Sequence, residues 1–535
     1  MGVRVYMSRK TCDVLFFTMV FTLIFMNIPN LIQMGFVGGG LGSKLCFYPI
    51  IIGMIYTFYC HYKYRSVLVG FTKLRNYVAV YLGVTMLSLV VGLYTFPYYD
   101  MILSGPADQI EKLPKVLAFF NGYGIAVTQQ QLLGLWMLVR PIKSLIMYVF
   151  YTLGTAYMIY CWYHDNWKRA LDIVTKAVLC SIGVISVYCI IEINYLAGSQ
   201  WAGKVLANIN PYIHEVKTDG KWWPPLLWKG QLRSLFAEPS YFGMYSAFCL
   251  PFLWLQIIKK KHYLYIVLTV IMTFLLFLTK ARTGFMLHLG ELVLLLLVVL
   301  FLRPKENWKG FAIILCCSAV AFFGSNVFIS NYMTPKNNFP QKIVAPKSMT
   351  KNAKPTISDS MKTYVESNAA SLANPDKRSN RARYSVMEAD FKIGLDHPLL
   401  GVGMGLRSAY MPDYFSKVAL ENGEVKMWLS FQKKLGVLRS GFPKLGEYTT
   451  RFAETGLLGL VAFLFPPIVL ILSILKRLKK GYSNETIDYG MFLIAFVGMM
   501  AAAIGDSINI TWCYWVLLGL GYAMCFGKDE KKEIE

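Results

Sequence analysis

Long apolar segments recur along the chain, and they constrain its fold more than any other feature. A run of about 18 or more apolar residues makes a helix long enough to cross the hydrocarbon core of a bilayer. Such runs account for a composition in which 56% of the 535 residues are hydrophobic and only 16% are charged. Twelve spans are predicted, at 13–34, 44–60, 77–97, 141–163, 174–196, 241–258, 262–279, 284–302, 309–329, 455–475, 488–505 and 508–526. The chain is therefore expected to be an all-α, polytopic integral membrane protein.

The short loops between these spans are alternately basic. The basic ones read MGVRVYMSRK, HYKYRSVLVGFTKLRN, HDNWKRA, KKKH, RPKENWK, KRLKKG and KDEKK, and all fall on one side if every span crosses. Cytoplasmic loops of membrane proteins collect Lys and Arg. The pattern predicts that both termini are cytoplasmic, and it explains a formal net charge of +24 without a nucleic-acid partner.

The N-terminal segment has the basic start and apolar middle of a signal peptide. Its apolar run, VLFFTMVFTLIFMNIPNLIQMGF, is too long for the central region of a signal peptide and lacks a clear A-x-A-type cleavage site. We expect this segment to be retained as a signal anchor.

The predicted spans divide the chain into three parts. Residues 1–329 hold spans 1–9 with outer loops 98–140 and 197–240, residues 330–454 form a large outer loop, and residues 455–535 hold the last three spans and a short cytoplasmic tail. The apolar piece LLGLWMLV in the first outer loop is too short to span, so we expect it to be re-entrant or interfacial.

Two of the outer loops have unusual compositions. Loop 197–240 holds four tryptophans, which suit either an interfacial belt or a platform for stacking sugars; they are Trp201, Trp222, Trp223 and Trp228. Loop 330–454 carries 19 Lys and Arg against 11 Asp and Glu. Long loops escape the positive-inside rule, so this excess indicates either a solvated basic face or an anionic, lipid-linked ligand.

Metal and disulfide chemistry have no signature in the sequence. Most of the 11 cysteines lie in apolar segments, no C-x-x-C pair or Cys/His cluster occurs, and the six histidines are scattered. We expect free thiols that pack as small hydrophobes, no metal site and no cofactor.

Ionisable residues at the membrane boundary are costly and are therefore candidates for function. Four groups share the predicted outer side: Arg233 and Glu238 before span 6, Lys280 and Arg282 between spans 7 and 8, Arg381 and Arg383 with His397 in the large loop, and Arg451 and Glu454 before span 10. Interfacial snorkelling of the cations and helix N-terminal charge for the carboxylates are the alternatives.

Together these groups fit one kind of reaction. Guanidinium groups bind diphosphate bidentately and keep their charge in any environment. A carboxylate beside them suits a general base that takes a proton from a sugar hydroxyl. Arginines that stabilise a leaving diphosphate make a metal unnecessary. The pattern predicts transfer of a sugar from a diphosphate to another hydroxyl.

The segment HPLLGVGMG adds glycines 401, 403 and 405. No strand–turn–helix unit surrounds them, so a dinucleotide-binding fingerprint is disfavoured. A close backbone turn near the site is the preferred interpretation.

Five segments together resemble the bacterial O-antigen polymerase and O-antigen ligase superfamily of polytopic glycosyltransferases. They are RSLFAEPSYFG (233–243), LTKARTGF (278–285), RARYSVMEADFKIGLDHPLLGVGMG (381–405), RFAETGLLGL (451–460) and WCYWVLLGLGYA (512–523). The resemblance covers roughly residues 140 to 526. It implies a GT-C-like fold and an inverting, metal-independent glycosyl transfer on the outer face of the bacterial cytoplasmic membrane. It also implies that Arg233, Arg282 and Arg381 or Arg383 hold the diphosphate.

The same resemblance bears on the type of reaction. Ligases of the superfamily typically carry a His-Asn pair before the E-x-G that opens the following span, whereas this chain has Leu445 and Gly446 there. This favours a polymerase of O-antigen, capsule or exopolysaccharide over a ligase that transfers glycan to lipid A-core. Glu238 is then the first candidate for the general base, followed by Glu447, Glu454 and His397.

The implied partners are membrane lipids and oligosaccharides linked to undecaprenyl diphosphate, which serve as both donor and acceptor. The resemblance also suggests a membrane protein that determines chain length. A flippase or transporter of lipid-linked oligosaccharide is the alternative from another class. The predicted span interiors hold almost no ionisable residue, with Glu192 and Glu291 as exceptions near span ends, and this favours an outer-face site.

Overall fold

The computed structural model describes residues 7–37, 41–64, 70–215, 224–259, 263–302, 305–333, 378–480 and 483–527. Trp222, Trp223 and the first part of the large loop, which carry some of the expectations above, lie outside these residues. Across the described ranges the chain is helical and contains no strand, in agreement with the predicted all-α class.

Eight helices are long and apolar enough to cross a membrane. They are α3 (Phe71–Tyr94), α6 (Gln129–Tyr163), α7 (Trp167–Leu196), α9 (Pro239–Ile258), α11 (Arg282–Leu302), α12 (Lys305–Tyr332), α18 (Glu447–Leu478) and α19 (Asn484–Ala502). The other predicted spans correspond to α1 (Arg9–Phe21), α2 (Phe47–Tyr64), α10 (Tyr263–Leu278) and α20 (Cys513–Phe526). These helices indicate a multi-pass membrane protein; a total of twelve crossings stays a prediction.

Two sequence expectations about span limits are corrected. The predicted span 13–34 is not one helix, because α1 ends at Phe21 and gives way to the short 3-10 turns η1 (Thr22–Ile24) and η2 (Asn30–Ile32). Asn27, with φ 55°, breaks the helical path between those turns. The LLGLWMLV piece does not form a re-entrant segment of its own, because it belongs to the first turns of the long helix α6; an interfacial position for it stays a prediction.

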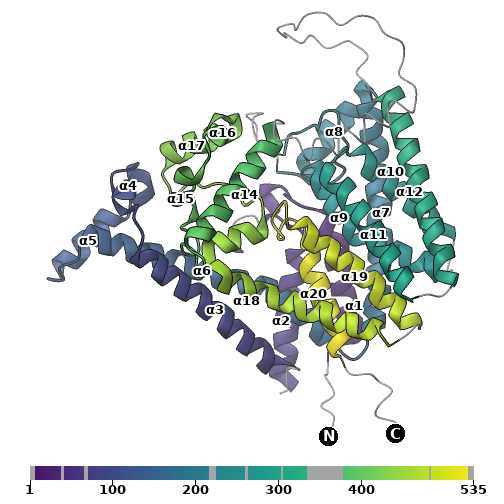
Figure 1. Ribbon diagram of the computed structural model, residues 1–535, viewed down its shortest axis with the longest axis horizontal. Coiled ribbons are helices and arrows are strands. Elements are labelled where there is room, and N and C mark those ends of the chain that lie inside the picture. Colours follow the sequence, from purple (N-terminus) through teal and green to yellow (C-terminus); the bar gives the residue numbers. More distant parts are fainter. Residues whose placement is uncertain are drawn as a thin grey trace, which may run out of the picture.

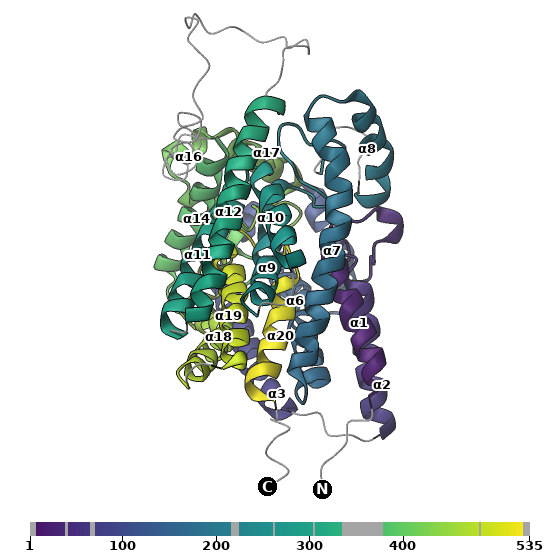
Figure 2. The same cartoon turned by 90° about the vertical axis from the view of Figure 1, so that its right-hand side faces the viewer.

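Helix α9 lies at the centre of the bundle (Figures 1 and 2). Its sequence is apolar on every face, which is typical of a helix surrounded by other helices, and 94% of its span is buried. It packs against α7, α10, α11, α12 and α19. The N-terminal end of this buried helix is therefore a rigid place for a functional side chain.

A second helical layer covers one end of the bundle, and we call it the cap. It consists of α4 (Tyr99–Leu103), α5 (Leu113–Gly122), α14 (Arg378–Asp396), α15 (Arg407–Tyr414), α16 (Lys417–Glu421), α17 (Gly423–Leu435) and the first turns of α6. The cap has a hydrophobic core of its own, built around Val386, Ile393, Tyr410 and Met411. Figure 2 shows α14, α16 and α17 at the upper end, together with α8 (Gln200–Ile213).

The start of α1 and the end of α20 lie close together at the end of the bundle opposite the cap. Arg9 at the start of α1 forms a 2.8 Å ion pair with Asp165 in the α6–α7 turn. Gly527, just after α20, packs so closely on His164 of the same turn that an added Cβ would lie 2.0 Å from its carbonyl oxygen. The cap and the two ends of the described chain therefore lie at opposite poles.

The HPLLGVGMG loop inserts its backbone into a break in α18. Gly456 has φ 62° and ψ −165°, so the helix is interrupted there. The carbonyls of Ala453 and Glu454, which lose their partners within the helix, accept hydrogen bonds of 2.9 and 3.0 Å from the N–H groups of Val402 and Gly403. The turn agrees with the close backbone approach that the glycines predict.

The backbone N–H groups that follow the break also find partners in the inserted loop. The N–H groups of Leu457 and Leu458 donate to the carbonyls of Pro398 and Leu399 at 2.8 and 3.2 Å. Buried backbone groups must be paired, and a break in a membrane helix is tolerated where other chain segments supply the partners. The inserted loop therefore holds α14, which precedes it, in a fixed position over the bundle.

Replacing Gly456 with Ala is expected to destabilise the protein by about 2 kcal/mol or more, because its backbone conformation is essentially restricted to glycine and costs another residue about 1–3 kcal/mol before any clash is counted. An added Cβ would also lie 2.3 Å from the carbonyl carbon of Leu399. Thermal unfolding of the detergent-solubilised protein measures the effect. Gly290→Ala is the control, since a Cβ there meets no atom within 4 Å. Equal unfolding temperatures for the two variants would show that the break is not a constraint.

Candidate active site

Glu238 lies directly before α9, at the position where a helix is usually capped. Pro239 occupies the first helical position, where its fixed φ suits the start of a helix. Glu238 itself is extended, with φ −149° and ψ 161°, and its side chain makes no capping hydrogen bond to α9. Glu238 therefore does not cap the backbone of α9, and its side chain interacts instead with side chains of the first turn, among them Tyr241.

Arg383 of α14 connects the cap to the α19–α20 connection. Its Nη1 donates to the Gly505 carbonyl oxygen at 2.8 Å and to Oδ2 of Asp506 at 3.3 Å. The half-buried Glu238 carboxylate interacts electrostatically with both Arg383 and Asp506. We call Glu238, Arg383 and Asp506 the acid–arginine cluster. It brings three distant segments of the chain together.

The cluster changes the acidity of its two carboxyl groups. Burial raises the pKa of Glu238 above its ordinary value of 4.5, the guanidinium of Arg383 opposes this, and the negative charge of Asp506 adds to it. Burial likewise raises the pKa of Asp506 against the opposing effect of Arg383. A carboxylate whose pKa is moved toward neutrality is a better general base than an ordinary one.

The motif glycines bring LTKARTGF beside the start of α9. Gly243 in α9 and Gly284 in α11 touch so closely that a Cβ added to Gly243 would lie 2.6 Å from Cα of Gly284. Both helices begin at the cap end, so the turn that carries Lys280 and Arg282 lies at the same pole as Glu238. Burial lowers the pKa of Lys280.

Arg381 differs from its neighbour Arg383 in having an unsatisfied donor. Its Nε is buried and has no hydrogen-bond partner within the described part of the chain. An orphaned buried N–H is costly, and an anion is a suitable partner for it. Arg381 therefore keeps the ligand-binding role that the sequence predicts for it.

Glu447 and Arg451, by contrast, satisfy each other at the start of α18. Nε of Arg451 donates to Oε1 of Glu447 at 2.8 Å, and its terminal nitrogens donate to the hydroxyls of Tyr81 and Tyr148 at 2.7 and 2.8 Å. The other carboxylate oxygen of Glu447 accepts from the Ser507 hydroxyl at 3.0 Å. These contacts fix the α19–α20 connection that carries Asp506, and they favour a supporting role for both residues.

Glu454 and His397 lie farther along the same region of the cap. Oε2 of Glu454 forms a 3.1 Å ion pair with Lys444. The ring of His397 stacks edge-to-face on Tyr410 with centroids 5.7 Å apart. Neither residue contacts the acid–arginine cluster through a described hydrogen bond, so both stay weaker predictions for a catalytic base.

Arg233 is held by backbone groups of the protein. Its side chain is 1% exposed, and its terminal nitrogens donate to the carbonyls of Pro225 and Leu226 at 2.7 and 3.1 Å. The backbone N–H of Arg233 donates to Glu192, the buried acid of α7, at 3.0 Å. The guanidinium thus holds the loop before α9, and its contact with a diphosphate stays a prediction.

The sequence interpretation missed several residues that build this region. Asp506 was not singled out, although it is an acid in the outer connection between the last two spans. The buried ion pair of Arg407 with Asp390 was also missed; Arg407 further donates to the carbonyls of Phe442 and Pro443, both at 3.2 Å. The sequence offered one clue to this pair: an acidic residue, Asp390, stands in the segment with helical spacing, and a basic residue, Arg407, follows shortly after the glycine-rich turn.

The described residues contain no group of His, Cys, Asp and Glu that could hold a metal ion. The chemical groups that gather at the cap end are therefore a carboxylate of raised pKa, a half-buried arginine, and further cations on the neighbouring turn. This set can accept a proton and neutralise an anion.

Comparison with known proteins bears on the family to which this part of the chain is similar. Residues 267–427 match the family model of O-antigen ligase. The matched segment runs from α10 to α17 and includes Lys280, Arg282, Arg381 and Arg383. For this part of the chain the match confirms the resemblance to the O-antigen ligase and polymerase superfamily, and it supports a membrane glycosyltransferase-like activity. A search of curated proteins finds no match.

Replacing Arg233 with Lys tests its structural role. Lysine keeps the charge but cannot reach both carbonyls, and leaving a buried carbonyl unpaired costs about 1–3 kcal/mol. We expect a lower unfolding temperature and less protein in the membrane. Lys204→Gln, at an exposed position of α8, is the control. Normal stability together with a raised KM for a lipid-linked donor would instead identify Arg233 as a ligand residue.

Proposed function

We propose that the protein polymerises oligosaccharide repeat units linked to undecaprenyl diphosphate, on the outer face of the bacterial cytoplasmic membrane. The product is O-antigen, capsular polysaccharide or exopolysaccharide. The single observation that carries the proposal is the acid–arginine cluster, in which Glu238 lies within electrostatic range of Arg383, an arginine of the segment that matches O-antigen ligase.

In the proposed reaction Glu238 takes the proton from a hydroxyl of the acceptor sugar. The hydroxyl oxygen forms a bond to the anomeric carbon of the donor. The bond from that carbon to the diphosphate breaks, and its electron pair stays with the departing diphosphate. The attack comes from the face opposite the leaving group, so the configuration is inverted.

The cations around the cluster are proposed to stabilise the leaving diphosphate. Diphosphate gains negative charge as it leaves, and positioned guanidinium groups stabilise that charge. Arg383 is one third exposed, so one side of it is available. Lys280, Arg282 and Arg381 are the further candidates for contact with the diphosphate. No metal is needed in this scheme.

Polymerase is preferred to ligase because the residues at the position of the ligase His-Asn pair are Leu445 and Gly446. Gly446 precedes the first residue of α18 and has no side chain to act as a base. We place both termini in the cytoplasm, opposite the cap, and keep a chain-length-determining membrane protein as a predicted partner.

Deletion of the gene in its host, followed by gel analysis of surface glycans, tests the proposal. We expect single repeat units on the acceptor in place of long polymer. Unmodified lipid A-core with accumulated lipid-linked polymer would identify a ligase. Unchanged glycans would contradict both functions.

Replacing Glu238 with Gln is expected to lower kcat by about 10²–10⁴-fold, because a general base contributes about that much. The rate of polymer formation is measured with purified protein and lipid-linked oligosaccharide in nanodiscs. Glu388→Gln is the matched control, since Glu388 lies on α14 and is half-exposed in a surface ion pair with Lys392. A normal rate for Glu238→Gln would remove it as the base.

The pH dependence of the rate gives a test with a defined sign. A base works when deprotonated, so the rate falls as the pH drops through the pKa of Glu238, which burial holds above 4.5. Asp506→Asn removes a negative neighbour, so this acid limb should move to lower pH. Arg383→Gln removes a positive neighbour, so the acid limb should move to higher pH. The same acid limb in all three proteins would contradict the assignment of the base.

A further inference from the structure

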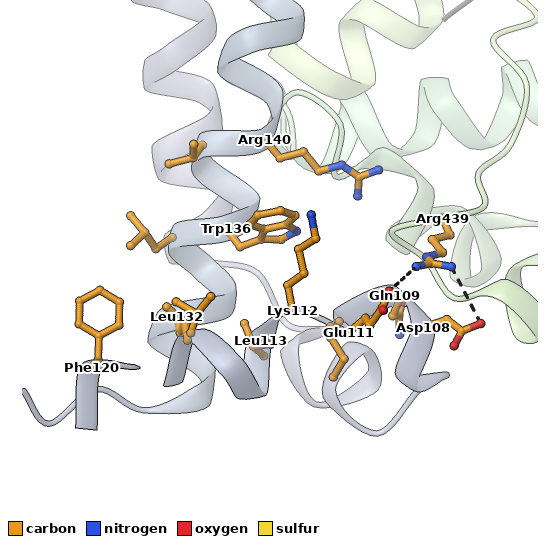
Figure 3. Close-up of a pocket in the computed structure, with 14 residues that line it drawn as sticks. Asp108, Gln109, Glu111, Lys112, Leu113, Phe120, Leu132, Trp136, Arg140 and Arg439 are labelled. Carbon is orange, nitrogen blue, oxygen red and sulfur yellow. Dashed lines mark ion pairs between the residues drawn. The ribbon is translucent and has the colours of Figure 1, made fainter. Parts of the chain in front are cut away.

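A groove lies within the cap, between α5 and the first turns of α6 (Figure 3). Its volume is about 530 Å³, within the usual range of ligand sites. It is formed by η4 (Ala107–Ile110), α5, the first turns of α6 and Arg439 of the segment that follows α17. None of these elements contributes to the acid–arginine cluster.

The wall of the groove is apolar and continues down α6. Leu132, Leu135, Trp136 and Val139 line it. Leu135 and Val139 are exposed, and so are Ile146 and Phe150, which follow at helical spacing on the same face. An exposed apolar stripe on a membrane helix faces lipid, so the groove opens toward the acyl region of the bilayer.

Two cations, Lys112 and Arg140, lie beside this apolar wall. Figure 3 shows Lys112 extending toward Trp136, with Arg140 reaching from α6 toward the side of Arg439. Arg439 already has acidic partners, Asp108 at 3.9 Å and Glu111 at 3.5 Å. Lys112 and Arg140 make no ion pair with any residue in the described ranges; Arg140 donates to the Leu438 carbonyl at 2.8 Å. The lining holds three cations (Lys112, Arg140 and Arg439) against two carboxylates (Asp108 and Glu111), so its formal charge is +1.

Hydrogen bonds of a buried glutamine hold the floor of the groove in place. Gln109 is 7% exposed, and its amide donates to the Ile102 carbonyl at 2.9 Å while its oxygen accepts from the Leu438 N–H at 3.3 Å. Gly436, with φ 84°, packs directly against the Gln109 side chain. These bonds hold η4 and the segment after α17 together.

The segment after α17 also connects the groove to the catalytic region. It carries Arg439 at the groove, then Lys444, which pairs with Glu454, and it ends at Glu447 beside the α19–α20 connection. The groove is thus linked to the α19–α20 connection, which carries Asp506, through the chain segment from Arg439 to Glu447.

We propose that the groove binds a lipid-linked diphosphate, with its diphosphate at Lys112 and Arg140 and its isoprenoid chain along the apolar stripe of α6. This inference rests on the proposed function, because a polymerase uses two lipid-linked molecules and the acid–arginine cluster accounts for one of them. The groove is the second site. A long apolar chain with an anionic head matches both halves of the groove, whereas a free phosphate would use only the cations.

Binding of undecaprenyl diphosphate to the full-length protein in phosphatidylcholine nanodiscs tests the inference. Lys112→Glu should weaken one of two binding events by about tenfold or more, which corresponds to the loss of one charge-assisted contact. Arg383→Gln should weaken the other. Lys115→Glu is the matched control, since Lys115 is an exposed cation of α5 outside the groove lining. Lys112→Glu is preferred to an Arg140 variant because Arg140 also supports the Leu438 turn.

Three results would overturn the inference. The Lys112→Glu and Lys115→Glu variants could bind undecaprenyl diphosphate with the same affinity. Phosphatidylglycerol could displace undecaprenyl diphosphate at equal concentration, which would make the groove a site for ordinary phospholipid. Lys112→Glu could lose a co-purifying membrane protein while its lipid binding is unchanged, which would make the groove a protein-docking surface.

The binding measurement does not need turnover, so it separates this inference from the proposed function. Equal binding by Lys112→Glu and wild type, with polymer still dependent on the gene, would remove the groove and leave the polymerase. A clear effect of Lys112→Glu, in a protein whose gene deletion leaves surface glycans unchanged, would remove the polymerase and leave the lipid site.

Discussion

The break in α18 at Gly456 is the constraint on which the arrangement of the cap depends. Two hydrogen bonds that a continuous helix would make across this point are replaced by four bonds to the loop 398–403. The cap and the bundle are thereby joined through their backbones. Ser88 of α3 adds to the joint, with its hydroxyl 2.5 Å from the Leu400 carbonyl. Because α14 leads into this loop, the break determines where α14 stands.

The position of α14 in turn decides which charges meet. One side of the helix is fixed by the buried ion pair of Asp390 with Arg407, and breaking such a pair costs about 3–5 kcal/mol because it leaves an uncompensated charge. Another side presents Arg383 to Asp506 and Glu238. The cluster therefore combines one carboxylate from the bundle, one from the α19–α20 connection, and an arginine from the cap. Burial and the negative neighbour raise the pKa of Glu238, and Arg383 limits that rise.

The sequence predicts the position of most helices because apolar runs and basic loops report them directly. Helix ends are less predictable: α6 begins at Gln129, since the capping box of Thr128 and Gln131 starts it well before the apolar run and Pro141 does not end it. Glu238 and Arg383 were recognisable as candidates from charge at the membrane boundary. The hydrogen bonds of Arg233 to two backbone carbonyls were not recognisable, because backbone partners leave no signal in the sequence. Asp506 was missed since the predicted spans leave almost no connection around it.

A structure of the Glu238→Gln protein with a bound undecaprenyl-diphosphate oligosaccharide, obtained by electron cryomicroscopy, tests the central claim most directly. We expect the diphosphate to lie within hydrogen-bond distance of Arg383 and an anomeric carbon to face position 238. A diphosphate bound elsewhere in the cap, with Arg383 still satisfied only by Gly505 and Asp506, would contradict it.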